Sequence, residues 1–240
     1  MATSDEGLPN THIRLMAFAI PILFAVISAV AMYQVSAWRT ARELDARSRP
    51  LRDPALEPLF ERLATALDIE HLQVHLYDIP QVNGLAAPDG RILITRGFLD
   101  RFKAGEITGA ELSSVVAHEV GHVALGHSRR RVLDAGGQNA ARVALAMTLG
   151  RFLPGIGPLI AGLAGMLLSA RLSRQDEYEA DAYAAALLTR AGIGTKPQVS
   201  LFRKLERMSA QTGAPAWLAS HPSCSDRIAA IRRIEDSWRS

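Results

Sequence analysis

The pattern of hydrophobic and polar positions first sets apart residues 15–38, an apolar run without a charged side chain. At about 1.5 Å per residue this run is longer than the roughly 30 Å hydrocarbon core of a bilayer. We therefore predict one transmembrane helix, with Tyr33 and Trp38 where interfacial aromatic residues gather. A cleaved signal peptide is the alternative, because residues 35–37 resemble a cleavage site. Asp5, Glu6 and the length of the run favour an uncleaved anchor.

Arginines are unevenly distributed around this run. Arg14 alone precedes it, and five follow it, namely Arg39, Arg42, Arg47, Arg49 and Arg52. By the positive-inside rule, the chain beyond the run lies on the cytoplasmic side. We predict a single-pass protein of a bacterial-type inner membrane. A periplasmic domain is the alternative, since arginines beside a folded domain can serve that domain instead.

The patterns after the run predict a mixture of helices and short strands. Apolar residues at helical spacing predict an amphipathic helix over 54–67. Alternation predicts strands at 71–77 and 91–95, and the Pro-Asp-Gly turn at 88–90 predicts a hairpin of 82–86 with 92–95. Further helices are predicted at 174–191 and 198–208. A last helix carries an apolar stripe of Ile228, Ile231, Ile234 and Trp238.

These elements predict a mainly α chain of the α+β class, with a small hairpin or sheet beside a central helix. The predicted order is a tail at 1–14, the anchor at 15–38, a basic linker at 39–53 and one domain at 54–240. With 48% hydrophobic and 21% charged residues, the chain can bury a core.

Charge and cysteine content exclude two classes of site. The net charge is only +3, and the basic residues are scattered without interleaved aromatic residues, so no nucleic-acid partner is predicted. Cys224 is the single cysteine, so an internal disulfide and a cysteine-based metal site are excluded. Any metal must bind histidine and carboxylate side chains.

One predicted helix carries an H-E-x-x-H motif. Thr108 and Glu111 form a capping box that begins this helix, and a glycine at 126 is a suitable end. His118 and His122 are four positions apart and share a face, so each can give one nitrogen to a zinc ion. Glu119 points towards an open coordination position, where it can act as general base. Two surface histidines beside a chance glutamate are the alternative.

An acidic pair follows, with 54 residues between His122 and its first member. Glu177 and Asp181 share a helical face, which predicts Glu177 as the third zinc ligand. Asp181 is predicted to accept a hydrogen bond from the far nitrogen of a ligand histidine. Glu179 is predicted to be solvated, although spacing alone does not separate it cleanly from Glu177. His127 is predicted to be a helix-end histidine, because a continuous helix turns it about 180° from His118.

A further apolar stretch at 143–168 raises the question of a second span. It is interrupted by Arg151 and by the Pro-Gly-Ile-Gly-Pro sequence at 154–158. One span would separate the two motifs across the bilayer, and two spans need roughly 40 apolar residues. We therefore predict two short helices joined by a bend and no full span.

The chain resembles the HtpX and CAAX-prenyl-endopeptidase family of zinc metallopeptidases over about residues 55–235. The resemblance is carried by HEVGH at 118–122, SRQDEYEAD at 173–181, SHPSCSDRI at 220–228 and VNGLAAPDGRILITRGFL at 82–99. It implies a zincin-like domain with one Zn²⁺ per chain, and it favours Glu177 over Glu179 as ligand.

The same resemblance implies roles for residues that spacing alone does not single out. His221 is implied above the zinc, as a reversible fourth ligand or as a donor to the oxyanion. Arg227 is a weaker candidate for the same electrostatic task. The hairpin is implied to bind an extended peptide along an edge strand made of Val82, Asn83, Gly84, Leu85 and Ala86. Gly84 stands where alanine is common, which we interpret as a mild change.

We predict a membrane-anchored, zinc-dependent endopeptidase that hydrolyses unfolded or membrane-proximal polypeptides, with a role in protein quality control. A non-catalytic zinc-containing chaperone or adaptor is one alternative, against which Glu119 argues. A latent protease, covered by the bend at 154–158 or by the His221 loop, is another.

Overall fold

The computed structural model describes residues 27, 31, 34, 35, 38, 39, 42–87, 89–127, 157–212, 217, 218, 221 and 224–239. The chain forms two compact units, Met1–Ala46 and Arg47–Ser240, and the second holds every element discussed below. The predicted anchor at 15–38 falls almost wholly outside the described residues. Within those residues, no helix combines the length and apolar character needed to cross a membrane.

The described residues of the second unit include one mixed sheet with the strand order β1-β2-β4-β3. β2 and β4 are parallel, and the other neighbouring pairs are antiparallel. The strands are β1 (Ser48–Pro50), β2 (Val74–Tyr77), β3 (Gly84–Ala86) and β4 (Ile92–Thr95). The predicted hairpin is confirmed, with Gly84 opposite Ile94. β1 was not predicted, since its three residues lie in the segment interpreted as a linker.

Burial explains the order of the strands. All four residues of β4 are buried, as the apolar sequence Ile-Leu-Ile-Thr requires for a strand covered on both faces. β3 lies at the edge of the sheet, paired only with β4 among the described strands. It is also shorter than predicted, because the strand begins at Gly84 and not at Val82.

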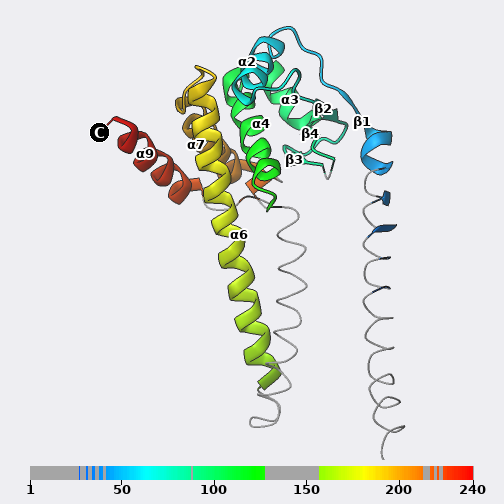
Figure 1. Cartoon of the computed structure of the whole chain (residues 1–240), viewed down its shortest axis with the longest axis vertical. Coiled ribbons are helices and arrows are strands. Elements are labelled where there is room, and N and C mark those ends of the chain that lie inside the picture. The colour runs from blue at the N-terminus through cyan, green and yellow to red at the C-terminus, as the bar shows by residue number, and fades with distance from the viewer. Residues whose placement is uncertain are drawn as a thin grey trace, which may run out of the picture. The chain divides into compact units, whose positions relative to one another are not determined.

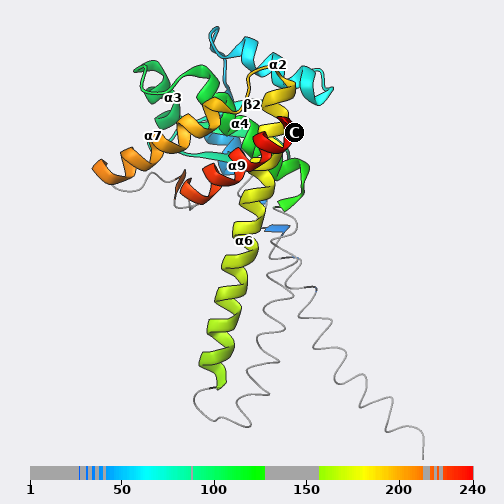
Figure 2. The same ribbon diagram turned by 90° about the vertical axis from the view of Figure 1, so that its left-hand side faces the viewer.

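Six helices have both ends within the described residues (Figures 1 and 2). They are α2 (Glu57–Leu67), α3 (Arg96–Lys103), α4 (Gly109–Ala124), α6 (Gly157–Arg190), α7 (Lys196–Thr212) and α9 (Cys224–Arg239). Those predicted over 54–67 and 198–208 are present with shifted ends. α3, which directly follows β4, was not predicted.

The prediction for the second apolar stretch is wrong beyond its bend. α6 runs without a break from Gly157 to Arg190, so the predicted short helix and the helix at 174–191 are one element. After Pro158 the helix contains no proline, and Pro158 lies in the first turn, where its missing N–H costs nothing. The bend residues before 157 lie outside the described part.

α4 is the central helix of the unit and packs on α6, α7, α2 and β3 (Figure 1). Every residue from Glu111 to His122 is buried. This part of the helix is therefore covered by other elements on all sides. The predicted capping box is confirmed: Thr108 Oγ1 accepts from Glu111 N at 3.2 Å, and Glu111 Oε2 accepts from Thr108 N at 2.7 Å.

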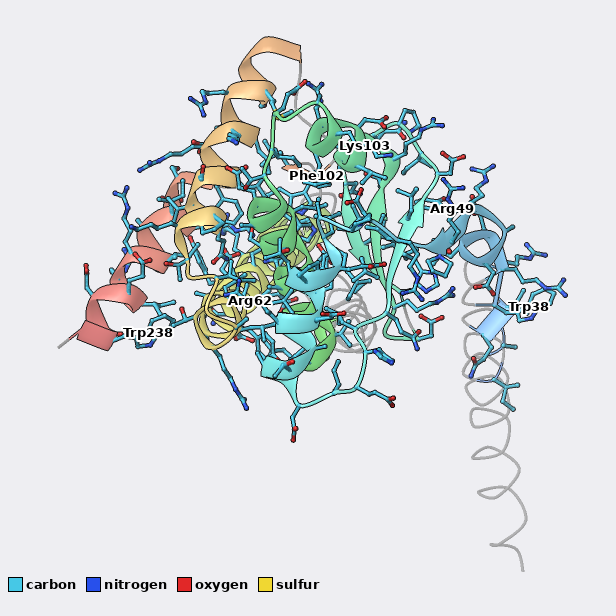
Figure 3. All side chains as sticks on the ribbon, turned by 90° about the horizontal axis from the view of Figure 1, so that it is seen from above. Trp38, Arg49, Arg62, Phe102, Lys103 and Trp238 are labelled. Atoms are coloured by element: carbon cyan, nitrogen blue, oxygen red, sulfur yellow. The ribbon has the colours of Figure 1, made fainter. Side chains whose placement is uncertain are left out.

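The remaining helices close the core around α4. α7 and α9 contact each other, and α9 also packs on α6 (Figure 2). On α2, Arg62 reaches the end of α6, where its Nε donates to the Ala191 carbonyl at 2.9 Å (Figure 3). Trp238 lies near the outer end of α9 and is 48% exposed. The largest fully buried apolar side chains of the described residues are those of Trp217, Phe98 and Phe202.

Candidate metal centre

The two motif histidines face each other across one turn of α4. Their Nε2 atoms are 3.0 Å apart, and their rings meet edge to face. His118 is 1% exposed and His122 is 5% exposed. Two imidazole nitrogens held this close in a buried site need either a shared proton or a shared cation between them.

Glu177, on α6, joins His118 and His122 in a three-residue group. Its Oε2 is 3.4 Å from His118 Nε2, and its Oε1 is 3.5 Å from His122 Nε2. Ligand atoms placed tetrahedrally at about 2.0–2.1 Å from zinc are roughly 3.3 Å from one another. The measured separations of 3.0–3.5 Å therefore fit one tetrahedral ion held by these three side chains.

His221 lies in the same cluster. Its Nδ1 is 2.7 Å from Glu177 Oε2 and 3.3 Å from His118 Nε2, so the four residues could together surround a metal ion. Trp217 stacks on the His221 ring at 5.0 Å between centroids. The structure thus places His221 where the resemblance implied, within reach of the ligand atoms.

Glu119 differs from its neighbours because one of its oxygens lacks a hydrogen bond. The side chain is buried, and Oε1 has no hydrogen-bond partner among the described residues. His221 Nε2 lies 3.6 Å from the same oxygen. A buried carboxylate oxygen without a partner is costly, so a water or substrate group is expected to complete this site.

Behind His118 lies a buried ion pair. Asp181 Oδ1 is 3.0 Å from His118 Nδ1, and Arg227 donates to both Asp181 oxygens, at 2.6 and 2.7 Å. Burial alone would raise the pKa of Asp181, but the charge of Arg227 and its hydrogen bonds hold that pKa below its usual value. Arg227 is 1% exposed, so its ion pair with Asp181 is buried and does not lie at the surface.

The cluster is strongly polarised. Burial opposes protonation of His118, yet hydrogen bonds to Asp181 and Glu177 outweigh it and raise its pKa to about 9. Burial, together with the nearby charge of His118, lowers the pKa of His122 to about 2. Burial would raise the pKa of Glu177, but hydrogen bonds from His118 and His221 hold it far below its usual range.

Glu179, predicted to be solvated, is only partly exposed, with 33% of its side chain accessible. Its Oε2 is 3.3 Å from Nε2 of His127, and its Oε1 accepts from Gln175 at 3.0 Å. His127 is fully buried, and its Nδ1 is 2.9 Å from Nδ1 of His122. His127 lies outside the four-residue group that includes His118. Its contact with His122 was not predicted.

Comparison with known proteins adds the family. A sequence model of Peptidase family M48 matches residues 50–235. The chain belongs to peptidase family M48. It is a metalloprotease, a hydrolase of peptide bonds, and the described motif residues form a histidine and glutamate cluster suited to a metal.

Three relatives agree with this assignment. Metalloprotease LoiP of Escherichia coli strain K12 is 29% identical over 181 residues, which cover 74% of this chain and 68% of LoiP. A protease HtpX homolog of Bordetella petrii is 28% identical over 262 residues, covering 95% and 88%. Metalloprotease YcaL of Escherichia coli strain K12 is 31% identical over 157 residues, covering 65% and 59%.

The hairpin of this M48 peptidase presents a shorter edge than predicted. Val82 and Asn83 precede β3, and their carbonyls accept from Trp217 N and from Thr95 N. Along an antiparallel pair of strands, hydrogen-bonded and non-hydrogen-bonded residue pairs alternate. Gly84 and Ala86 belong to non-hydrogen-bonded pairs, so their backbone N–H and C=O groups point away from β4. These groups face the edge at which no described strand pairs with β3.

Two further residues of the M48 site were missed by the sequence analysis. Gln198 on α7 lies with its Nε2 3.3 Å from Asp181 Oδ1. Trp217 is fully buried between His221 and Phe202, and the Arg227 guanidinium lies over its ring. Gln198 gave no signal in the sequence. Trp217 gave a weak one, as the one aromatic residue in the sequence between positions 209 and 220.

Proposed function

We propose that this M48 metalloprotease is a zinc-dependent endopeptidase in which His118, His122 and Glu177 hold one Zn²⁺ per chain. The observation that carries the proposal is the triangle of predicted ligand atoms, 3.0–3.5 Å on each side, next to a buried oxygen of Glu119 that has no hydrogen-bond partner among the described residues. When bound, zinc lowers the pKa of a coordinated water to about 7 and polarises a carbonyl.

Glu119 carries the proton in this proposal. Its Oε1 accepts a proton from the attacking water and then delivers it to the amine nitrogen that leaves when the peptide bond breaks. Asp181 accepts the Nδ1 hydrogen of His118, which keeps the Nε2 lone pair of that ring turned towards the ligand cluster. Arg227 acts through Asp181, which it fixes with two charge-assisted hydrogen bonds.

The substrate in this proposal is an extended polypeptide. It adds to the edge of β3, where Gly84 and Ala86 offer backbone hydrogen bonds. A methyl group at Gly84 would lie 3.5 Å from Glu119 Oε1, so this edge runs directly beside the proposed base. Backbone recognition is independent of side-chain sequence, which suits unfolded or membrane-proximal proteins and a role in quality control.

The location is proposed from the sequence alone. The apolar run at 15–38 anchors the chain in a bacterial-type inner membrane, and the following arginines favour a cytoplasmic domain, with the periplasm as the alternative. A reporter fused after residue 240 distinguishes the two sides.

The Glu119→Gln variant tests the reaction. It keeps the size of the side chain and the three ligands, so we expect zinc to remain bound while cleavage of casein falls by about 10² to 10⁴-fold. Zinc content is measured by elemental analysis and cleavage by release of labelled peptides. Wild-type cleavage rates in this variant would refute the role of Glu119.

A latent protease is a second candidate, and the position of His221 favours it. Its Nδ1 lies in the ligand group, 3.3 Å from His118 Nε2, where a fourth ligand would block the open position. If His221 acts as a reversible fourth ligand, His221→Ala raises basal proteolysis. If it donates to the oxyanion, the same variant lowers kcat with little change in KM. If the protein were a non-catalytic chaperone, neither the wild type nor the His221→Ala variant would show proteolysis.

A further inference from the structure

We propose that His127, held by Glu179, is a positioning residue that fixes the ring and tautomer of His122. This proposal rests on the proposed function, since it requires His122 to be a metal ligand. It assigns a role to a buried histidine and a partly exposed glutamate that the reaction described above does not use.

The turn after α4 brings His127 to this place. The helix ends at Ala124, and Gly126 adopts a left-handed conformation with φ of 66°. Residues other than glycine rarely adopt this backbone conformation, which here turns the chain out of the helix. As a result His127 packs against His122 with ring centroids 4.9 Å apart, although a continued helix would separate the two rings by more than a third of a turn.

The hydrogen positions in this group follow from one requirement. If His122 gives its Nε2 lone pair to a metal, the hydrogen of the neutral ring is on Nδ1. That hydrogen points to Nδ1 of His127 at 2.9 Å, which must then be an acceptor. The hydrogen of His127 is therefore on Nε2, which faces Glu179 Oε2 at 3.3 Å and Asp176 Oδ1 at 3.9 Å.

Each candidate ligand histidine thus has a carboxylate behind it, but the two connections differ. His118 is linked directly to Asp181, whereas His122 reaches Glu179 through the ring of His127. His127 is fully buried, so bulk water does not compete for its Nδ1. Partners of this kind fix the orientation of a ligand, and their loss typically lowers metal affinity about 10 to 100-fold.

The test compares two substitutions of His127 in the purified full-length chain. His127→Leu removes the acceptor for His122 and keeps an apolar side chain in the buried position. His127→Gln offers an amide oxygen to the same hydrogen. We expect the first to weaken Zn²⁺ binding about 10 to 100-fold in chelator competition, and the second to recover most of that loss.

The hydrogen-bonded series His122–His127–Glu179 is called the relay below. Glu179→Gln tests its last member. This variant should weaken zinc binding less than His127→Leu does, since an amide oxygen still accepts the His127 hydrogen. His71→Leu is the matched control, because that side chain is 83% exposed and belongs to neither group of candidate metal-binding residues. Its zinc affinity should equal that of the wild type. A Co²⁺-substituted form provides a second readout, since the visible absorption of cobalt reports the geometry of its ligands.

The outcomes separate this proposal from the proposed function. Retention of stoichiometric zinc by His122→Ala would refute the ligand assignment itself. Loss of zinc by His122→Ala, with wild-type affinity and an unchanged cobalt spectrum in His127→Leu, would refute only the relay. A second equivalent of zinc, bound by the wild type and lost in Glu179→Gln, would also refute it, since His127 would then be a ligand. Reduced affinity with recovery by His127→Gln supports it.

Discussion

Two buried glutamates on α4 have opposite surroundings. Glu111, in the first turn, is 3% exposed, and Glu119, two turns further on, is 2% exposed. Glu111 accepts hydrogen bonds from Thr108 N, Ser200 Oγ and Lys204 Nζ at 2.6–2.7 Å. Glu119 Oε1 has no hydrogen-bond partner in the described part of the chain.

The difference separates a carboxylate that stabilises the fold from the one to which we assign the proton transfer in the proposed reaction. A buried carboxylate with several donors contributes to stability, because the charge-assisted bonds replace its lost hydration. A buried carboxylate oxygen without a donor lowers stability and persists where function requires it. The same residue type on the same helix is therefore assigned two roles by its partners alone.

The largest effect should come from neutralising each glutamate in turn. Glu119→Gln should lower proteolysis about 10² to 10⁴-fold and leave the fold equally or more stable, because a buried charge disappears. Glu111→Gln should lower stability and leave kcat within a few-fold of the wild type. Casein cleavage and thermal unfolding of both variants measure the contrast. Similar losses of activity in both would show that the two carboxylates do not have separate roles.

A smaller effect should follow from adding a methyl group at Gly84, which would press on Val115 of α4, between the two glutamates. A methyl group at Gly84 would lie 2.6 Å from Val115 Cγ1, so the exchange to alanine is not the mild change that the sequence suggested. We expect Gly84→Ala to lower stability by about 1–3 kcal/mol and to reduce proteolysis, because β3 must move away from Glu119.

The double variant Gly84→Ala with Val115→Ala is the control for this crowding. Removing the Val115 methyl groups makes room for the new one, so activity should recover relative to Gly84→Ala alone. A double variant as inactive as the single one would show that the backbone of Gly84, and not its lack of a side chain, is what matters.

The sequence was sufficient for features determined within one helix or one turn. The capping box, the shared face of His118 and His122 and the hairpin depend on contacts between near neighbours, and spacing describes these well. The wrong prediction for α6 came from expecting a boundary where residues 169–173 simply continue a helical pattern. α3 was missed because it follows β4 with no intervening loop residue.

Features that depend on distant segments could not be predicted. Glu179 was expected in solvent because its own helix gave no sign of a partner, and His127, which it contacts, lies 52 residues earlier. The position of His127 itself was judged along a helix that in fact ends before Gly126. Gln198 and Trp217 reach the site through tertiary packing alone.

A moderate effect on stability is expected at Glu111 itself. Glu111→Gln leaves the Lys204 ammonium without its carboxylate partner and weakens the capping box, so the free energy of unfolding should fall by about 1–3 kcal/mol at pH 7. Denaturant titration measures this loss. The matched variant Glu106→Gln, whose side chain is 46% exposed, should change the same quantity by less than about 0.5 kcal/mol.

The smallest and most specific effect concerns the pH dependence of that loss. Burial alone would raise the pKa of Glu111, but hydrogen bonds from Lys204, Ser200 and Thr108 outweigh it and lower the pKa below 4.5. A carboxylate with a lowered folded pKa binds fewer protons in the folded state. Its contribution is therefore complete above pH 4.5 and disappears as the pH falls through the folded pKa. The stability difference between wild type and Glu111→Gln should shrink below pH 4.5, whereas that between wild type and Gly84→Ala should stay constant. A Glu111 difference that is independent of pH would mean that shape, and not charge, makes this end of α4 stable.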